Sequence, residues 1–402
     1  MTIKDFSGGI HWRRHPSQVP SHQAVMYTNI DNEKSVLVPH KKDSIVTPGP
    51  EYLYWHWFTK ADAIISRPDR GTFTEYRQWL YYFMEQPSSS SSLADAEKGL
   101  KYDKDKLEPQ KVGVNKPNTT LELVSAEDST EPTYKGFITY TYTFYNEETD
   151  IESAPAEKLS IETQYENDVI LTIKGFEQPP EGYDIRLYRI DDVMIDFNLV
   201  DTIDRENYAN EYRDENVATE VAGEYILDSY GNLPPKEELK YVIMAHNVFI
   251  GAIDNKVYYS KDAQPDYWPE ENFLEFDTDI TGLAEVQNGL LVFTKYKTYI
   301  VTGTSSKTFA SYILNGNIGC ENFYSIQYVN NGVIWHSNKG IVWSSGGNIQ
   351  LISYDNLGET KFKSYNSVAV YRQYLLHTSI GILLFDFRLG LSIKKLTQLG
   401  EL

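Results

Sequence analysis

The sequence predicts an all-β protein in which a β-propeller is interrupted by an inserted β-sandwich. Aromatic residues make up 14% of the chain, including 31 Tyr, whereas Met occurs only five times, and this bias favours strands over helical bundles. Hairpins recur in the C-terminal part at a period of about 42 residues, which is typical of propeller blades. The composition changes sharply at Pro87, and a sequence of another kind begins near Leu121.

The stretch from Val248 to Gly303 contains two hairpins and sets the repeat. In the first, residues 248–253 and 256–259 alternate in phase about the turn Asp254-Asn255, which is the period of a strand pair. In the second, LLVFT and TYIVTG flank Lys295-Tyr296-Lys297. We therefore expect two neighbouring strand pairs of one repeating architecture.

Two further hairpins continue the series. VIWHS and IVWSS flank Asn338-Lys339-Gly340, and YLLHTS and ILLFDF flank Ile380-Gly381. Successive turn centres are separated by about 42, 43 and 41 residues, the spacing of propeller blades. The alternative is four unrelated hairpins of a sandwich, whose turns usually come about every 8 to 12 residues. The longer spacing favours the propeller.

Residues 1–86 are predicted to form the opening part of the propeller. AVMYTNI and SVLVPH flank Asp31-Asn32-Glu33, and YLYWHWF and AIISR flank Thr59-Lys60. EYRQWLYYFM is expected to form one further aromatic strand that ends at Pro87. The spacing is shorter here than in the later repeat and does not define blade boundaries.

Residues 87–120 are predicted to be a polar linker or surface loop, because five serines, Ser88 to Ser92, precede a run dense in charge. Residues 121–232 show the short alternating strands and close turns of a β-sandwich; in GFITYTYTFYN, large apolar side chains alternate with threonines. Residues 233–402 are expected to return to the propeller.

Several runs resemble tail proteins of double-stranded DNA bacteriophages. These runs are Leu233-Pro234-Pro235, HNVFIGAIDNKVYYSK, PDYWPEENFLEF, LLVFTKYKTYIVTG, Gly319-Cys320 and VIWHSNKGIVW, with FSGGI and AVMYTNIDNEKSVLVP near the N-terminus. Through these runs the chain is similar to the tail nozzle proteins of short-tailed phages (podoviruses), which are also called tail accessory factors. The resemblance extends over about two thirds of the chain.

This resemblance implies a virion structural protein that forms a ring, a homohexamer, at the distal end of the tail channel. The ring would retain the genomic DNA and then conduct it during DNA ejection, in contact with adaptor and fibre proteins. FSGGI would pair with the last blade and close the propeller, which removes exposed sheet edges. The shared motifs are structural, so they carry over no catalytic residue and leave the channel and gate residues undefined. The loop from Asp262 to Phe276 and the Ser-rich segment are the candidates for a gate.

A second resemblance covers the predicted sandwich. YTYTFYNEETDIESAPAE, PPEGYDIRLYRI and YILDS are similar to fibronectin type III modules, which belong to the immunoglobulin-like sandwiches. The resemblance implies a module inserted into a propeller. The paired cysteines of antibody domains are missing, which agrees with the single Cys of the chain.

Charge and cysteine content narrow the function further. A net charge of −20 opposes tight binding to nucleic acid, because such binding needs Lys and Arg to displace counterions from phosphate. The lone Cys320 excludes an internal disulfide and is expected to be a buried thiol. The N-terminus lacks an apolar signal core and no run approaches the roughly 18 apolar residues of a membrane span, so we expect a soluble protein made in the host cytoplasm.

The sequence predicts no catalytic, cofactor or metal site, and therefore no enzyme. Acidic pairs such as Glu270-Glu271 and Asp277-Asp279 lie in expected loops, where solvation is the ordinary state. The stretch from Asp277 to Gly282 opens like a calcium loop, but Asn288 stands where a bidentate Glu is required. The stretch from Ser337 to Trp343 lacks the Asp of sialidase-type repeats.

The histidines show no metal-ligand spacing. His11 and His15 are four residues apart in a stretch without helix signals, and His246 is isolated. His336 and His377 occupy matching places in two hairpins, which predicts a repeated structural position.

Exposed aromatic side chains support an alternative function, a receptor-binding or glycan-binding tail protein, or less favourably a glycan hydrolase. Tyr54, Trp55 and Trp57 would form a stacking platform for sugars. However, the two tryptophans share a strand face beside Leu53, which favours a packed propeller blade.

Overall fold

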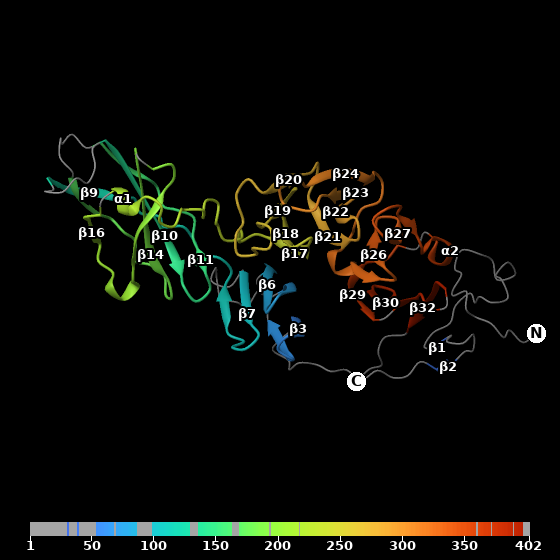
Figure 1. Cartoon of the computed structure of the whole chain (residues 1–402). Coiled ribbons are helices and arrows are strands. Elements are labelled where there is room, and N and C mark those ends of the chain that lie inside the picture. The colour runs from blue at the N-terminus through green and yellow to red at the C-terminus, as the bar shows by residue number, and fades with distance from the viewer. Residues whose placement is uncertain are drawn as a thin grey trace, which may run out of the picture. The chain divides into compact units, whose positions relative to one another are not determined.

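The computed structural model describes residues 30–31, 38–39, 54–67, 70–86, 99–128, 136–162, 169–192, 194–216, 218–358, 361–370, 372–388 and 390–396. The fold is all-β, with several small antiparallel sheets (Figure 1). The chain divides into two compact units. Unit 1 comprises 1–109, 237–262 and 273–402, and unit 2 comprises 110–236 and 263–272.

Four consecutive sheets of unit 1 are four-stranded antiparallel meanders in chain order. They are β17 (Lys240–Ala245), β18 (Val248–Ile253), β19 (Lys256–Tyr259) and β20 (Phe273–Glu275); β21 (Ile280–Val286), β22 (Gly289–Thr294), β23 (Thr298–Thr302) and β24 (Ala310–Asn315); β25 (Gln327–Val329), β26 (Gly332–Ser337), β27 (Gly340–Ser344) and β28 (Gln350–Leu351); and β29 (Ser364–Val370), β30 (Gln373–Thr378), β31 (Gly381–Asp386) and β32 (Ser392–Leu396). The 3-10 helix η4 (Phe323–Ser325) precedes the third sheet, and α2 (Tyr354–Leu357) precedes the fourth.

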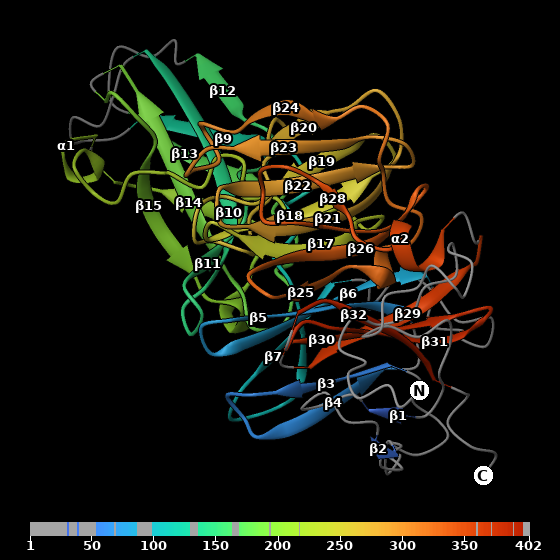
Figure 2. The same ribbon diagram turned by 90° about the vertical axis from the view of Figure 1, so that its right-hand side faces the viewer.

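The four hairpins predicted from the sequence are confirmed, and each is the central strand pair of one of these sheets. The pairs are β18 with β19, β22 with β23, β26 with β27 and β30 with β31. Figure 2 shows β21, β22 and β23 side by side in the second sheet. Each sheet adds a first strand that sequence analysis did not single out.

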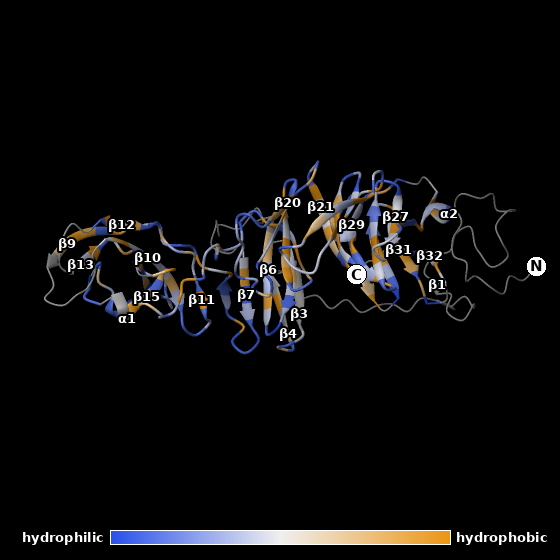
Figure 3. Cartoon of the chain, turned by 45° about the horizontal axis from the view of Figure 1, so that its top comes forward, coloured by the Kyte–Doolittle hydropathy of each residue, from blue (hydrophilic) through white to orange (hydrophobic). Residues whose placement is uncertain are grey.

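The sheets of unit 1 share cores because alternate residues of a strand face opposite sides. Leu290 and Val292 of β22 pack in a cluster with residues of the first sheet, whereas Leu291 and Phe293 pack with Trp335 and other residues of the third. A further cluster joins the third sheet to the fourth. A strand between two such cores is buried along its whole length, and Figure 3 shows the apolar residues concentrated in the strands.

The N-terminal part of unit 1 begins with two strand pairs, β1 (Ile30–Asp31) with β2 (Val38–Pro39) and β3 (Tyr54–Phe58) with β4 (Ala63–Arg67). A fifth four-stranded sheet follows: β5 (Arg70–Tyr76), β6 (Trp79–Gln86), β7 (Gly99–Asp103) and β8 (Pro109–Lys111). FSGGI and the serine run lie outside the described residues.

Two expectations for this region are wrong. EYRQWLYYFM is not one strand, because the chain turns at Arg77-Gln78, where Arg77 has a φ of 54° and Tyr76 pairs with Trp79. Residues 87–120 are not only a linker, since β7 pairs with β6 and buries Leu100 and Tyr102. In β7 the apolar Leu100 and Tyr102 pack into this core, but charged Lys101 and Asp103 alternate with them, so the segment looks polar in the sequence.

Unit 2 consists of two antiparallel sheets around one core. The first contains β10 (Phe137–Asn146), β11 (Ile151–Glu152), β12 (Leu159–Glu162), β14 (Asp184–Asp191) and β15 (Asn198–Ile203), and the second contains β9 (Glu122–Asp128), β13 (Val169–Lys174) and β16 (Glu211–Asp214). The short helices η3 (Arg205–Asn207) and α1 (Ala218–Val221) lie in connections. Tyr140, Tyr142, Ile185 and Leu187 of the first sheet share a core with Leu171 and Ile173 of the second.

Unit 2 has wider limits than the predicted 121–232. It extends over 110–236 and includes residues 263–272, which come from the connection between β19 and β20. Trp268 of this segment is buried. Within the parts of the chain described above, no helix is long and apolar enough to cross a membrane.

Candidate functional site

An open pocket of about 870 Å³ lies in unit 1, where the first strands of three successive sheets meet. Contacts join the first strands β5 to β17, β17 to β21, and β25 to β29, whereas β21 contacts β26 and η4 of the third sheet and its approach. The pocket has an apolar lining that includes Ile243, Met244, Leu283, Phe323, Ile326 and Val333. Its size and lining fall in the range of sites for small molecules.

Three polar side chains of the pocket come from two-residue turns that link the first and second strands of their sheets. His246, Gln287 and Asn331 supply one polar group from each of the three sheets. The backbone is left-handed at both turn residues of His246-Asn247, with φ of 52° and 62°, and of Asn330-Asn331, with φ of 52° and 58°. Hairpin turns of this twist require positive φ at both positions, which Asn and His tolerate better than most residues.

Glu285 supplies the one carboxylate found among the described residues that line the pocket. Its side chain is exposed, and its Oε1 accepts a hydrogen bond of 3.4 Å from the backbone N–H of His246. This contact places the carboxylate of β21 beside the β17–β18 turn. The pocket therefore combines one negative charge with an apolar lining.

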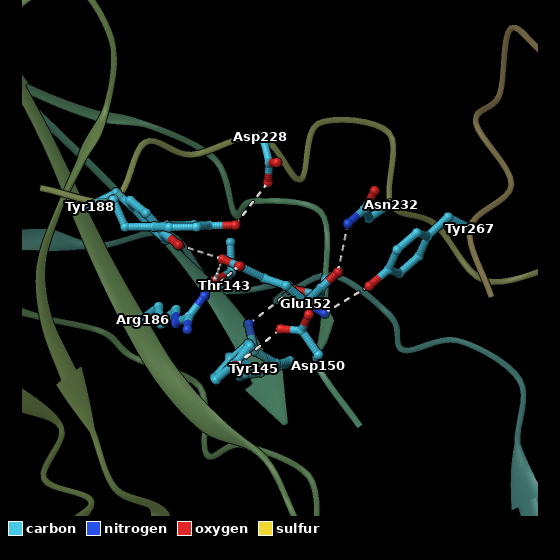
Figure 4. A network of polar contacts seen from close by, with 12 residues as sticks. Thr143, Tyr145, Asp150, Glu152, Arg186, Tyr188, Asp228, Asn232 and Tyr267 are labelled. Atoms are coloured by element: carbon cyan, nitrogen blue, oxygen red, sulfur yellow. Dashed lines mark hydrogen bonds and ion pairs between the residues drawn. The ribbon is translucent and has the colours of Figure 1, made fainter. Parts of the chain in front are cut away.

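Unit 2 contains a buried carboxylate with three side-chain partners, shown in Figure 4. Glu152 Oε1 accepts hydrogen bonds from Thr143 Oγ1 at 2.7 Å and from Tyr188 Oη at 2.6 Å, and its Oε2 lies 2.9 Å from Arg186 Nη1. Burial raises the pKa of the Tyr188 phenol, and the neighbouring carboxylate raises it further. Because its three side-chain partners come from β10 and β14, this glutamate is suited to holding strands together.

The guanidinium of Arg186 also contacts two tyrosine rings. Its Cζ lies 3.3 Å from the ring centre of Tyr145 and 5.0 Å from that of Tyr225. Tyr145 donates a hydrogen bond of 3.2 Å to Asp150 (Figure 4), and Tyr225 donates one of 3.2 Å to Asp228. Cation–π contacts thus fix the arginine that neutralises Glu152.

A second buried ion pair in unit 2 joins the two sheets. Arg189 Nη1 of β14 lies 2.7 Å from Asp214 Oδ2 of β16, and the same oxygen accepts a hydrogen bond of 2.5 Å from Tyr140 Oη of β10. Burial raises the pKa of the Tyr140 phenol well above its usual value. The carboxylates of both networks are paired, which is the arrangement of structural ion pairs.

Residues 263–272 attach to unit 2 near both ends of the segment 110–236. The backbone N–H of Gly113 donates to Asp266 Oδ1 at 2.9 Å, and the backbone N–H of Trp268 donates to the carbonyl of Leu233 at 2.7 Å. The backbone N–H of Glu152 donates to Tyr267 Oη at 3.0 Å (Figure 4). We call residues 263–272 the strap.

The acidic residues considered from the sequence do not assemble into a reactive group. Asp277 binds Lys297 and Tyr299, and the Lys297 hydrogen bond is the main cause that lowers its pKa. Glu270 and Glu271 are exposed. In the ranges that the structure describes, no group of three or more His, Cys, Asp or Glu is placed to hold a metal ion. The side chains of Tyr54, Trp55 and Trp57, and His11 and His15, lie outside what is described.

His336 and His377 do occupy matching places, pairing with Ile341 and Ile382 in their hairpins, but their surroundings differ. His336 is buried, stacks on Phe362 with ring centres 4.7 Å apart, and has Nδ1 2.9 Å from Ser364 Oγ. Burial lowers the pKa of His336 to about 4. His377 is exposed, so the two histidines share a position in the hairpin but not an environment.

Cys320 is a buried thiol, as predicted. Its side chain is fully buried in the cluster between the second and third sheets, and burial raises its pKa to about 12. A protonated, inaccessible thiol is a packing residue.

Comparisons with known proteins give no family. No family model matches the chain, and no curated protein matches it. Among solved structures, the computationally designed Ika8 protein is 10% identical, with 78% of this chain and 82% of that chain covered and a TM-score of 0.26. PorZ, an essential bacterial surface component of the type-IX secretion system of Porphyromonas gingivalis, is 8% identical over 79% of this chain and 56% of its own, with a TM-score of 0.28. At such TM-scores neither likeness carries an argument.

Proposed function

We propose that unit 1 is a β-propeller and that unit 2 is an immunoglobulin-like sandwich of the fibronectin type III kind inserted into it. The propeller is supported by five four-stranded meanders, four of them at a period of about 42 residues, and by the contacts between their first strands. In a propeller the first strand of each blade lies nearest the axis. The pocket would then lie close to that axis.

The sandwich proposal is supported by strand order. β12, β10, β14 and β15 form one sheet and β9 pairs with β13 in the other, which is the order of strands C′, C, F and G and of B and E in fibronectin type III modules. Tyr183 stands directly before β14, where such modules carry their corner tyrosine, and burial raises its pKa to about 12.

The function that these features support best is that of a non-enzymatic structural protein of a phage tail. The chain would form a ring, the nozzle at the distal end of the tail channel, which retains and then conducts genomic DNA. The observation that carries the proposal is the repeated series of sheets, in the same runs of sequence that resemble tail nozzle proteins. The buried carboxylates of Glu152 and Asp214 are paired with arginines, which favours a structural role over a catalytic one.

The acidic composition of the chain supports a ring through which DNA slides. Each Lys or Arg that pairs with a phosphate adds a salt-sensitive adhesive contact, whereas a wall with excess Asp and Glu repels the duplex and lets it slide. The chain has 57 acidic and 37 basic residues. Adaptor and fibre proteins would be the other partners of such a ring.

The test is the assembly itself. Light scattering on the purified chain should give six times 46.2 kDa, and a reconstruction of the ring should show a lumen with excess acidic side chains. A stable monomer at all concentrations, also in the presence of adaptor protein, would contradict the proposal. So would a lumen lined mainly by Lys and Arg.

A second candidate is a glycan-binding tail protein, favoured by the exposed residues Tyr225 and Tyr230 of unit 2, which are 47% and 48% accessible. A glycan array and a depolymerisation assay distinguish the structural tail protein from the glycan-binding one. Reproducible sugar binding by the monomer, abolished by Tyr225→Ala, would favour the second candidate, and glycan cleavage would exclude a purely structural role.

A further inference from the structure

The pocket of unit 1 has the properties of a binding site for one class of small molecule. Its volume of about 870 Å³ exceeds what a few waters require, and its lining is mainly apolar. An apolar lining favours a ligand with an aliphatic or aromatic body, because burying such a body removes apolar surface from water.

The charges of the lining select the sign of the ligand. Among the described residues of the lining, Glu285 is the single carboxylate, and none is Lys or Arg. The other polar side chains are an imidazole, a phenol and the carboxamides of Gln287, Gln327 and Asn331. An anion would meet repulsion from Glu285 and from the net charge of −20, whereas a monocation would find one partner.

The carboxylate lies beside the neighbouring sheet. Oε1 of Glu285 accepts a hydrogen bond of 3.4 Å from the backbone N–H of His246, and the exposed side chain remains accessible to a ligand. A charge-assisted hydrogen bond from an ammonium group is the contact that it can make best.

From these observations we propose that the pocket binds a small amphipathic monocation, a primary ammonium on an aliphatic or aromatic body, with the ammonium at Glu285 and the body against Met244 and Phe323. This inference rests on the pocket alone and is independent of the proposed role in a tail.

The chain offers a local reporter of occupancy. It contains five Met, and Met244 lines the pocket, whereas Met84 is buried in another core of unit 1 and Met194 belongs to unit 2. In the full chain labelled with 13C-methyl methionine, each methyl gives one resonance, and the variant Met244→Leu assigns the signal of the pocket.

Three probes with the same phenylethyl body separate charge from apolar burial: phenethylamine, 2-phenylethanol and 3-phenylpropionate. We expect phenethylamine to shift the Met244 methyl saturably, with Met84 and Met194 unchanged. The alcohol should bind about tenfold more weakly and the carboxylate more weakly still, since a hydrogen bond to a charged group is the difference between them.

Two matched variants complete the experiment. Glu285→Gln keeps the shape but removes the charge, and should reduce the affinity for phenethylamine about tenfold while leaving that for 2-phenylethanol unchanged. Glu321→Gln, at an exposed acid outside the lining, should have no effect. The proposal is overturned if Met244 does not respond, if the three probes bind equally, or if the two variants behave alike. None of these outcomes depends on ring assembly, so failure here leaves the proposed function intact.

Discussion

Tyr267 Oη accepts a hydrogen bond of 3.0 Å from the backbone N–H of Glu152, so the strap contacts the backbone of the same residue whose carboxylate is buried with Arg186. We expect Tyr267→Phe to lower the free energy of unfolding of unit 2 by about 1–2 kcal/mol, because the change leaves a backbone donor without its acceptor. Urea denaturation monitored by circular dichroism measures this change in the free energy of unfolding. Tyr312→Phe, at a tyrosine that is 59% exposed, is the matched control and should be neutral.

A glycine beside the strap provides a steric test. Gly113 has a φ of 71°, and a Cβ there would lie 2.6 Å from the carbonyl oxygen of Asp266 and 2.9 Å from Cα of Pro234. Gly113→Ala should destabilise unit 2 by more than about 1 kcal/mol, since backbone atoms must move in addition to the strain of positive φ. Gly223→Ala has the same kind of strain, at a φ of 101°, with nothing within 4 Å. Equal thermal shifts for both variants would exclude the steric contribution.

The buried network around Glu152 should depend on charge. Glu152→Gln leaves the Arg186 guanidinium buried without its counter-ion, and removal of one partner from a buried pair costs about 3–5 kcal/mol. We expect a large drop in the midpoint of thermal unfolding, measured by calorimetry. The exposed Glu147→Gln should change the midpoint little, and a similarly small change for Glu152→Gln would show that the pair is not important for stability.

His336 should make unit 1 sensitive to acid. Its pKa in the folded chain is lowered to about 4 because of burial, against about 6.5 when unfolded. The unfolded state therefore binds the proton first as the pH falls. The stabilisation, up to about 3 kcal/mol, is complete above pH 6.5 and is lost as the pH falls towards 4. His336→Gln should flatten the stability profile in this window, whereas the exposed His377→Gln should retain it; parallel profiles for both variants would contradict the assignment.

The two units should be separable only at the boundaries that the structure defines. Deleting 112–236 and replacing the strap by a short Gly-Ser bridge keeps β7 and β8, and should leave a β-rich remainder that unfolds cooperatively. Deleting 88–232 instead removes β7 and its buried Leu100 and Tyr102 from the fifth sheet, and should give a less stable product. Circular dichroism and calorimetry compare the two. Identical melting curves would mean that β7 contributes nothing.

The central hairpins were predictable because their apolar alternation and turn residues are local signals. Asp254-Asn255 and Ile380-Gly381 mark turns without any knowledge of distant contacts. The first strand β21 was missed because its buried residues, such as Leu283 and Ala284, face different neighbouring sheets, and a strand buried on both faces does not alternate. The Asn in each of the turns before β18, β22 and β26 was the available signal.

The candidate pocket and the strap were not predictable, for a different physical reason. Met244, Glu285 and Tyr328 lie in three sheets and meet only through contacts between strands far apart in sequence. Tyr267 lies among Pro and Trp residues that mark a loop in the sequence. Nothing local indicates that its partner is Glu152, which lies more than a hundred residues earlier.

The position of the strap has a consequence for synthesis on the ribosome. Residues 110–236 emerge before residues 263–272, so the acceptor that Tyr267 offers to Glu152 and the buried indole of Trp268 reach unit 2 only after the whole of β17, β18 and β19 has been made. A nascent chain arrested between the two segments would expose Glu152 N–H and the carbonyl of Leu233. Completion of the earlier-synthesised unit therefore waits for a later part of the message, and translation of the 27 codons from 237 to 263 sets the shortest delay before the strap can begin to dock.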